Sequence, residues 1–288
     1  MRNLHLFVLT LLLSSFAYSQ APQLTAAQAV TISSGNLRLK AFLWKPDGNG
    51  PFPAVLFNHG MGSDAGHTAG MTMAEAAEKL APVFVRHGYA FLYLFRRGQG
   101  PSSDQASYID DILKREEAAR GAEASQHLKL VLLDTDHLQD VMAALAFLKS
   151  TPSVDSRRIA IVGHSFGGQL ALVAVERDRT LRAAVAFDGA AGHSWERSAE
   201  VRERLLTAVR NAVGPIMLTQ AANDYSTAPS RALAEELERL HKPHLLKIYP
   251  PVGKTADEGH DAVYLAIPMW EGDVFGFLDE YVKLKSKP

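Results

Sequence analysis

The chain has 288 residues, of which 47% are hydrophobic and 21% are charged, a composition typical of a globular protein with a sizeable core. The formal net charge is −1, and basic residues do not gather with aromatic ones, so neither nucleic acid nor an anionic membrane surface is indicated as a partner. The sequence contains no cysteine, which excludes disulfide bonds, a cysteine nucleophile and a thiolate metal site.

Residues 1–19 have the pattern of a secretory signal peptide. Arg2 precedes an apolar run from Leu4 to Leu13, and the small residues Ala17 and Ser19 stand before a cleavage point at Gln20. The alternative is an uncleaved anchor that lies in the membrane interface. We expect an exported protein, periplasmic or secreted, in which residues 20–288 form one domain. No other segment has the length of a transmembrane helix.

The remaining elements follow one another as strands and helices. Alternating apolar and polar residues predict a half-exposed strand at 37–44, after a short strand at 30–32. Apolar runs predict further strands at 54–57, 90–95, 158–162, 181–187, 215–218 and 245–249. Helices are predicted at 73–87, 132–149, 169–175, 198–212, 229–241 and 272–285. This alternation predicts an α/β protein with a parallel sheet covered by helices on both faces.

The segment 103–130 does not fit the simple alternation. It is long for a connection between strand 89–95 and helix 132–149, and its residues 110–123 are charged and rich in alanine. We interpret it as a helical insertion. A solvated surface helix is favoured over a lid across the active site.

The strongest motif is Gly163-His164-Ser165-Phe166-Gly167, directly after the strand at 158–162. A Gly-x-Ser-x-Gly sequence between a strand and a helix is typical of a nucleophile elbow, in which the serine hydroxyl is exposed at the carboxyl end of the sheet. The turn leaves no room for side chains two residues before and after the serine, which explains Gly163 and Gly167. We therefore predict that Ser165 is a nucleophile.

A serine nucleophile needs a base and an acid that orients the base. The acid candidate is Asp224, just beyond the strand at 215–218, and Asp188 after the strand at 181–187 is its rival. The base candidate is His260, on a loop between the last strand and the last helix, where we expect Gly259 to let the backbone bend toward Ser165.

Two backbone N–H groups are expected to form an oxyanion hole. One belongs to Phe166, next to the nucleophile, and the other to Met61 in the glycine-rich loop that follows the strand at 54–57. Candidate substrate-contacting residues are His59, Tyr108, Trp195 and Tyr225, and Met61 is a further candidate for the pocket wall. Arg97, in the loop after the strand at 90–95, is expected to pair with a buried carboxylate rather than to bind substrate. We predict no metal site, because no dense cluster of histidines and carboxylates occurs.

Several motifs in order resemble the α/β-hydrolase superfamily. They are Asn58-His59-Gly60, Arg97-Gly98-x-Gly100, Gly163 to Gly168, Asp224 and Gly259-His260. The approach to His59 through Gly50-Pro51-Phe52-Pro53-Ala54-Val55 resembles the dienelactone-hydrolase-related branch, and the resemblance covers residues 30–285. It implies an eight-stranded, mostly parallel sheet, a Ser-Asp-His triad and no cofactor. Dienelactone hydrolase itself is a cysteine enzyme, whereas this chain has Ser165, so dienelactone does not carry over as substrate.

These observations predict a serine hydrolase that cleaves small carboxylic esters through an acyl-enzyme. The same scaffold also hosts peptidases, so cleavage of an amide or peptide bond is the alternative within enzymes. A catalytically silent binding protein of the same fold is the alternative from another class. The sequence does not indicate the oligomeric state or the acyl and alcohol preferences.

Overall fold

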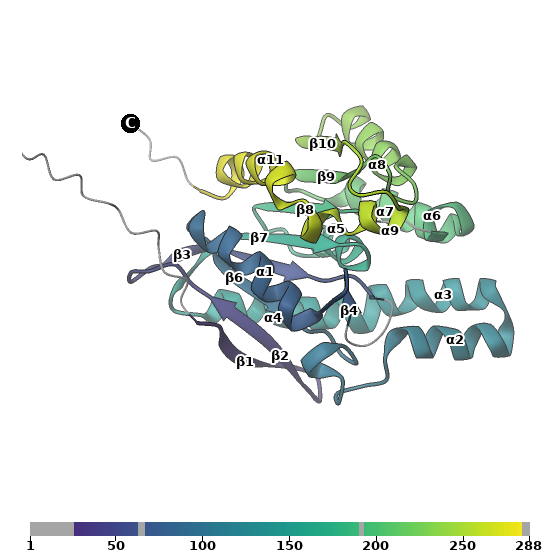
Figure 1. Ribbon diagram of the computed structural model, residues 1–288, viewed down its shortest axis with the longest axis horizontal. Coiled ribbons are helices and arrows are strands. Elements are labelled where there is room, and N and C mark those ends of the chain that lie inside the picture. The colour runs from purple at the N-terminus through teal and green to yellow at the C-terminus, as the bar shows by residue number, and fades with distance from the viewer. Residues whose placement is uncertain (1–25, 63–66, 190–192, 284–288) are drawn as a thin grey trace, which may run out of the picture.

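An eight-stranded sheet runs through the centre of the computed structural model, which describes residues 26–62, 67–189 and 193–283 (Figure 1). The predicted signal peptide lies outside these residues. The strand order is β1-β2-β6-β3-β7-β8-β9-β10, with β1 and β2 antiparallel to their neighbours and the other pairs parallel. The strands are β1 Gln28–Ser34, β2 Leu37–Trp44, β3 Phe52–Asn58, β6 Ala90–Leu94, β7 Val154–His164, β8 Ala183–Phe187, β9 Ile216–Ala221 and β10 His244–Tyr249. The predicted α/β-hydrolase fold is confirmed.

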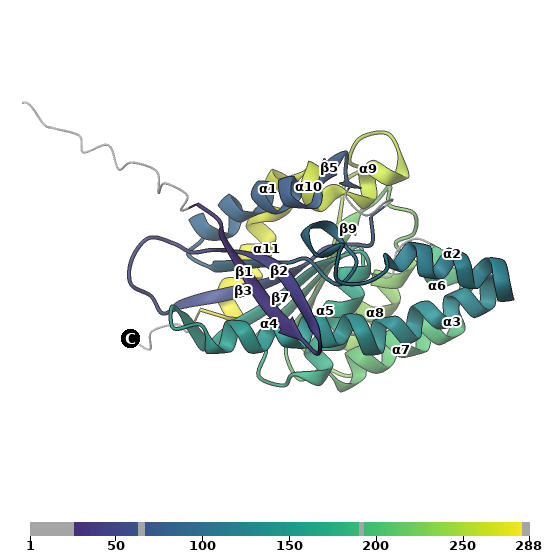
Figure 2. The same ribbon diagram turned by 90° about the horizontal axis from the view of Figure 1, so that it is seen from below.

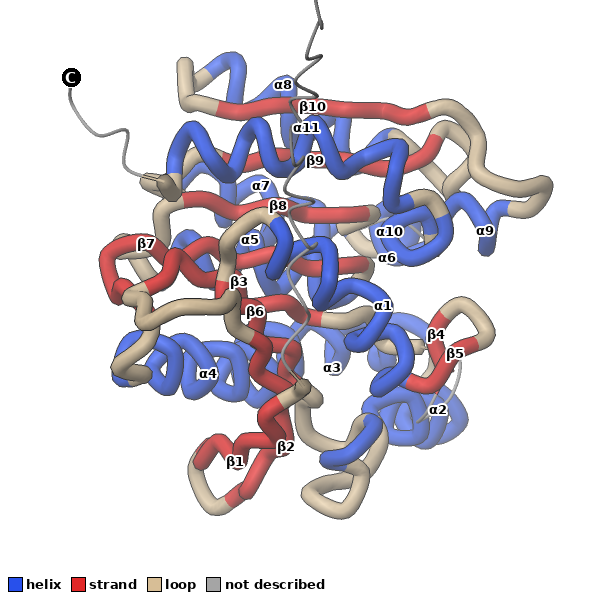
Figure 3. The backbone as a smooth tube through the Cα atoms, turned by 60° about the vertical axis from the view of Figure 1, so that its left-hand side comes forward, coloured by secondary structure: helices blue, strands red, loops and turns tan. Residues whose placement is uncertain are grey.

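Helices cover both faces of the sheet, and this explains the continuous apolar runs of its central strands. In β3, Ala54 and Leu56 pack into one core cluster, while Val55 and Phe57 pack into the other. Successive side chains of a strand point to opposite faces, so a strand covered twice must be apolar at every position. Figure 3 shows α1 and α11 crossing one of these faces. The covering helices are α4 Leu138–Ser150, α5 Phe166–Arg177, α7 Ala199–Asn211 and α8 Ala228–Arg239 on one face, and α1 Met73–Arg86 and α11 Ile267–Tyr281 on the other.

The insertion at 103–130 contains two antiparallel helices instead of one. They are α2 (Ile109–Arg120) and α3 (Ala122–Leu132), joined at Gly121. Its φ of 89° is a value that glycine adopts readily and other residues rarely do. Through a π-helical turn at Leu133–His137, α3 runs directly into α4. The predicted helix start at 132 is therefore wrong, because the helical path begins at Ala122. Figures 1 and 2 show this hairpin projecting beyond the sheet.

Short elements at the carboxyl edge of the sheet were not predicted. They are the hairpin of β4 (His67–Thr68) and β5 (Met71–Thr72), the 3-10 turn Gly100–Ser102, and the helices α6 His193–Arg197, α9 Ala256–His260 and α10 Ala262–Leu265. Segments of two to five residues carry too little periodicity to be recognised in a sequence. Over the described ranges, none of the helices combines the length and the apolar character needed to cross a membrane.

Candidate active site

Ser165 occupies a strained turn between β7 and α5. Its φ of 55° and ψ of −120° lie outside the regions that a side chain normally favours. A Cβ atom at Gly163 would lie 2.0 Å from the carbonyl oxygen of Gly167, and one at Gly167 would lie 2.0 Å from that of Asn58. Both glycines are therefore required by close backbone contacts, as the motif predicts, and the turn holds Ser165 at the N-terminus of α5.

The structure brings Ser165, His260 and Asp224 together through two hydrogen bonds. His260 Nε2 lies 2.9 Å from Ser165 Oγ, and His260 Nδ1 lies 2.9 Å from Asp224 Oδ1. The three residues follow β7, β10 and β9, and parallel strands place their carboxyl ends at one edge of the sheet (Figure 3). The Asp224 side chain is fully buried, whereas that of His260 keeps 15% of its surface exposed.

His260 lies at the end of the short helix α9 and not on a loop as expected. A capping box starts this helix, in which the Thr255 side chain accepts from the Glu258 N–H and the Glu258 side chain accepts from the Thr255 N–H. The expected role of Gly259 is also wrong, because its φ is not positive. A Cβ atom there would lie 2.7 Å from Asn223 Oδ1, so Gly259 permits close approach between α9 and the Asp224 loop.

Two groups besides His260 hold the Asp224 carboxylate in place. The Tyr225 N–H donates to Oδ1 at 2.6 Å, and Gln220 Nε2 donates to Oδ2 at 2.9 Å. Gln220 is buried on β9. It was not selected from the sequence, because a glutamine four residues before an aspartate is not a recognisable motif. Asp188, the rival acid, makes no hydrogen bond to His260 in the structure.

Buried polar side chains hold the glycine-rich loop after β3 in place. Arg96 Nη2 and His59 Nδ1 donate to the Gly60 carbonyl, at 3.0 and 2.7 Å. In a trans peptide the N–H points opposite to the C=O. The Met61 N–H therefore points away from Arg96 and His59, consistent with its predicted role as an oxyanion donor. Gly60 itself approaches the nucleophile so closely that a Cβ atom there would lie 3.1 Å from Ser165 Cβ.

The Met61 carbonyl is fixed as well. Gln99 Nε2 donates to it at 2.7 Å and the Tyr108 hydroxyl at 2.9 Å. Tyr108 therefore supports the glycine-rich loop after β3, although the sequence suggested a place in the substrate pocket. His59 has no exposed surface and also belongs to this support.

The other two proposed substrate-contacting residues differ in exposure. Tyr225 is 44% exposed, and its ring centre lies 5.1 Å from that of His260, so it lies beside the imidazole at the protein surface. Trp195 is 7% exposed and packs into the core cluster on the α5 face of the sheet.

Arg97 pairs with a buried carboxylate as expected. Its Nη2 lies 2.7 Å from Oδ1 of Asp140, whose side chain is fully buried on α4, and its Nη1 lies 3.0 Å from Asp136 Oδ1. These bonds tie the loop after β6 to the π-helical turn. They occupy the guanidinium with protein carboxylates, so Arg97 has a structural role.

His164, directly before the nucleophile, is a functional candidate that the motif did not indicate. It is buried, and its Nε2–H donates to the His260 carbonyl at 2.8 Å. Burial is the main cause that lowers the pKa of His164 to about 3, and the proximity of His260 contributes further. A neutral His164 therefore anchors the backbone of the base. Only the spatial meeting of β7 and α9 reveals this contact.

His137 is also buried and neutral, in the π-helical turn beside Phe166, with ring centres 5.3 Å apart. Burial, with the charges of Arg96 and Arg97, holds the pKa of His137 well below its ordinary value. Below about pH 6.5 the unfolded chain therefore binds a proton at this residue that the folded chain does not, which destabilises the fold. The stability that His137 contributes is present above that pH and is lost as the pH falls.

We expect His137→Phe to become more stable relative to the native protein as the pH falls. The difference in free energy of unfolding should grow by up to about 1.4 kcal/mol per pH unit below pH 6.5. Urea unfolding between about pH 7 and pH 5 measures it. The exposed His241 provides the matched control as His241→Asn. A constant difference for His137→Phe would contradict the neutral state.

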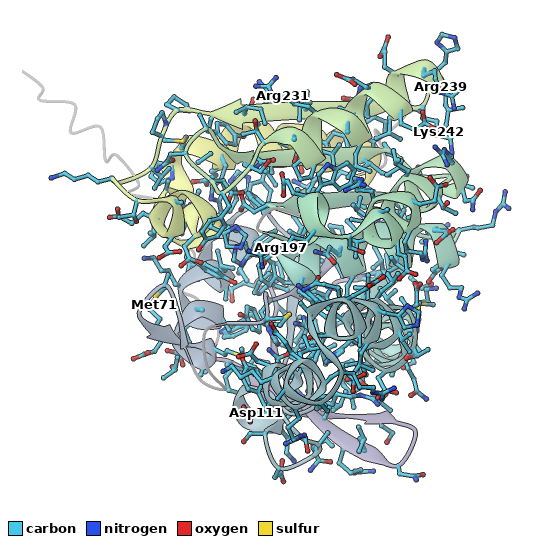
Figure 4. The ribbon with its side chains drawn as sticks, turned by 90° about the vertical axis from the view of Figure 1, so that its right-hand side faces the viewer. Met71, Asp111, Arg197, Arg231, Arg239 and Lys242 are labelled. Carbon is cyan, nitrogen blue, oxygen red and sulfur yellow. The ribbon has the colours of Figure 1, made fainter. Side chains whose placement is uncertain are left out.

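A cleft of about 880 Å³ separates the α2–α3 hairpin from α6 and the start of α7. Its walls carry charges of both signs, including Arg120, Glu123, Arg197 and Glu200. Figure 4 shows Arg197 between the hairpin, which carries Asp111, and the region of Arg231. Among the described residues that line this cleft, none belongs to the triad.

A carboxylate oxygen from each of Asp188 and Asp224 and a ring nitrogen of His260 lie within 4.8 Å of one another. This spacing alone would suit a cation. However, His260 bonds to Asp224 through one nitrogen and to Ser165 through the other, which is the arrangement of a proton relay. We therefore assign no metal to these residues.

Comparison with known proteins agrees with this architecture. The family model "Dienelactone hydrolase family" matches residues 39–260. The chain belongs to this family. The match begins in β2 and ends at His260, so it includes the nucleophile elbow and the strands that place Asp224 and His260.

Curated relatives of this family member match about half of the chain. The quorum-quenching protein AidA of Acinetobacter baumannii is 28% identical over 156 residues, which are 54% of this chain and 41% of AidA. The platelet-activating factor acetylhydrolase of Canis lupus familiaris is 28% identical over 157 residues, which are 48% of this chain and 35% of that protein. The matched segments are thus well under two thirds of the relatives' length.

Solved structures share the fold at low identity. A putative dienelactone hydrolase from Klebsiella pneumoniae has a TM-score of 0.63 at 17% identity, over 90% of this chain and 99% of that one. An acylaminoacyl peptidase from Pyrococcus horikoshii has a TM-score of 0.63 at 17% identity, over 91% of this chain and 42% of that one.

Proposed function

We propose that this protein is a serine hydrolase that cleaves carboxylic esters through an acyl-enzyme. The observation that carries the proposal is the continuous hydrogen-bond path from Asp224 through His260 to Ser165 Oγ, with the serine in a strained elbow. A serine hydroxyl is a weak nucleophile near neutral pH, and an adjacent imidazole removes this obstacle by taking the proton.

In the first half of the reaction, Ser165 Oγ attacks the ester carbonyl carbon while His260 Nε2 accepts the hydroxyl proton. The carbonyl oxygen becomes an oxyanion, which the N–H groups of Phe166 and Met61 stabilise. Collapse of this intermediate breaks the carbon–oxygen bond, and His260 donates its proton to the leaving alcohol. In the second half, water attacks the acyl-serine with His260 as base, and the acid product leaves.

Throughout both halves, Asp224 orients the imidazole and stabilises its protonated form. Its buried hydrogen bond to Nδ1 directs the other nitrogen toward Ser165. Because the site uses only side chains and backbone donors, the proposed reaction needs no cofactor, and its partner is a small-molecule ester.

Ester cleavage is favoured by one of the relatives, whose name describes removal of an acetyl group. Amide cleavage is the second candidate, because an acylaminoacyl peptidase shares the fold. Turnover of p-nitrophenyl acetate, compared with turnover of an aminoacyl anilide, separates the two. Labelling of Ser165 by a fluorophosphonate probe tests whether the serine is reactive at all, and an unlabelled folded protein would favour a silent binding role.

The export of the protein is a further part of this proposal, supported by the signal-peptide pattern of residues 1–19. N-terminal sequencing of the protein recovered from producing cells tests it. A mature chain that begins at Gln20 is the expected result, and a retained Met1 in a cytosolic fraction would contradict export.

Tyr108→Phe is expected to reduce kcat by about fivefold with little change in KM. The substitution removes the hydroxyl that fixes the Met61 and Gly62 carbonyls, so the proposed oxyanion donor is held less firmly. Loss of one neutral hydrogen bond of about 1 kcal/mol corresponds to that factor. Steady-state kinetics on p-nitrophenyl acetate measure it. An increase in KM alone would instead place Tyr108 in the substrate pocket.

A further inference from the structure

Asp188 is a buried acid that the proposed reaction leaves without a role. It follows β8, its side chain has no exposed surface, and its N–H donates to the Thr219 carbonyl at 2.9 Å. Its φ is +54°, in the left-handed region that aspartate and asparagine enter more readily than other side chains but less readily than glycine. Strain of this kind persists only where the surroundings hold the residue in place, and here it holds the carboxyl group beside the triad.

Both carboxyl oxygens of Asp188 lack a hydrogen-bond donor among the described residues. The basic group beside it is His164, whose Nε2 lies 3.9 Å from Asp188 Oδ2 and donates instead to the His260 carbonyl. His164 is neutral, since its pKa is about 3. A buried carboxylate without a donor or a cation is strongly unfavourable.

Asp224 lies beside Asp188, close enough that one carboxyl oxygen of each acid and a ring nitrogen of His260 fall within 4.8 Å of one another. Two carboxylates can only accept hydrogen bonds, whereas a carboxylic acid can donate one to a carboxylate. Like charges at such a separation do not both persist in a buried site. A proton between the two acids removes the repulsion and satisfies Asp188.

We propose that Asp188 is a neutral carboxylic acid that donates a hydrogen bond to the Asp224 carboxylate, so that the pair carries a single negative charge. Asp188 is then a positioning residue, and this role rests on the proposed function of the triad. Asp224 would receive four donors, namely the Tyr225 N–H, Gln220 Nε2, His260 Nδ1 and the Asp188 hydroxyl. A carboxylate has about four acceptor sites, so this set would fill them.

The electrostatic surroundings favour the neutral form. Burial is the largest cause that raises the pKa of Asp188 well above its ordinary value. The negative charge of Asp224 is the next cause, and Asp261 adds to the effect. The groups that face Asp188 are thus His164 from β7, Asp224 from the loop after β9, and His260 and Asp261 from α9 and its end. If Asp188 lost its proton at high pH, a second negative charge would stand beside the imidazole and push Asp224 away.

Two variants separate the hydrogen bond from the backbone strain. Asparagine and glycine both tolerate a positive φ, but only asparagine keeps a neutral donor. We expect Asp188→Asn to reduce kcat by less than about threefold, and Asp188→Gly to reduce it by roughly tenfold or more with KM unchanged. We also expect kcat of the native protein to fall at alkaline pH as Asp188 loses its proton, and this fall should be absent in Asp188→Asn.

A loss of turnover in Asp188→Asn as large as that of Asp224→Asn would overturn the proposal, because position 188 would then need a negative charge. Equal turnover of the Asn and Gly variants would overturn it as well, since the donor would have no effect.

Infrared spectroscopy tests the proton without any need for turnover. At about pH 7.5, above the pKa of about 6 to which burial raises Asp261, native protein minus Asp188→Asn should show the C=O stretch of a protonated carboxylic acid. Absence of this band would overturn the proposal, as would a band that appears only after dialysis against EDTA. If Ser165→Ala retained ester turnover, the proposed function would fail while this band still decided the state of Asp188.

Discussion

Ser165→Ala is expected to reduce ester turnover by about four orders of magnitude or more, with the folded structure retained. Alanine keeps the Cβ atom that already fits the strained elbow and removes only Oγ, the atom that His260 contacts at 2.9 Å. Without this oxygen no acyl-enzyme forms. The measurements are kcat and KM for p-nitrophenyl acetate, together with a thermal unfolding curve.

Ser103→Ala is the matched control. Ser103 is exposed at the end of the 3-10 turn after β6, and loss of its hydroxyl should leave turnover and unfolding unchanged. If folded Ser165→Ala kept turnover close to the native rate, the serine mechanism would be refuted. If turnover were lost because Ser165→Ala had unfolded, the thermal unfolding curve would show it.

The sequence was sufficient to predict the elbow because its causes are local. A strand, a helix and two glycines at fixed spacing determine the turn, and the close contact of Gly163 is with Gly167 and Gly168 just beyond it. The contact of Gly167 with Asn58, at the end of β3, is the part of the elbow that is not local. The positions of Asp224 and His260 followed from topology. Each was expected after a strand of a parallel sheet, and parallel strands bring these ends to one edge.

What the sequence could not predict depends on contacts between distant segments. Gly259 was explained by a backbone bend, whereas its real constraint is Asn223, on a different loop. The choice between Asp188 and Asp224 likewise required the position of His260, because both acids follow neighbouring strands. Tyr108 and His59 were placed in the pocket because aromatic residues near a site can line it or support it, and only their hydrogen bonds distinguish the two.

The helix that begins at Ala122 shows a different limit. Its first six residues, 122–127, include no large apolar side chain, so apolar periodicity becomes evident only toward α4. The hairpin is instead stabilised by its own pairing, in which Ser125 Oγ donates to the Leu113 carbonyl across the two helices. Such a contact cannot be inferred from either helix alone.

Gly163→Ala is expected to lower the free energy of unfolding by about 4 kcal/mol or more, and to abolish ester turnover. The new Cβ atom would lie 2.0 Å from the Gly167 carbonyl oxygen and 2.3 Å from its carbon, both in the backbone of the first turn of α5. No rotamer change relieves a clash with backbone, so either β7 or α5 must shift and Ser165 moves with it. Urea unfolding and the yield of folded protein measure this effect.

Gly276→Ala is the matched control, because it makes the same substitution where we expect no loss of stability. Gly276 lies in α11, its φ is not positive, and a Cβ atom there would meet nothing within 4 Å. Alanine in a helix interior is favoured over glycine by about 0.5–1 kcal/mol, so this variant should be slightly more stable and fully active. If Gly163→Ala unfolded at the same urea concentration as the native protein, the close contact between β7 and α5 would be wrong, and with it the geometry that exposes Ser165 to a substrate.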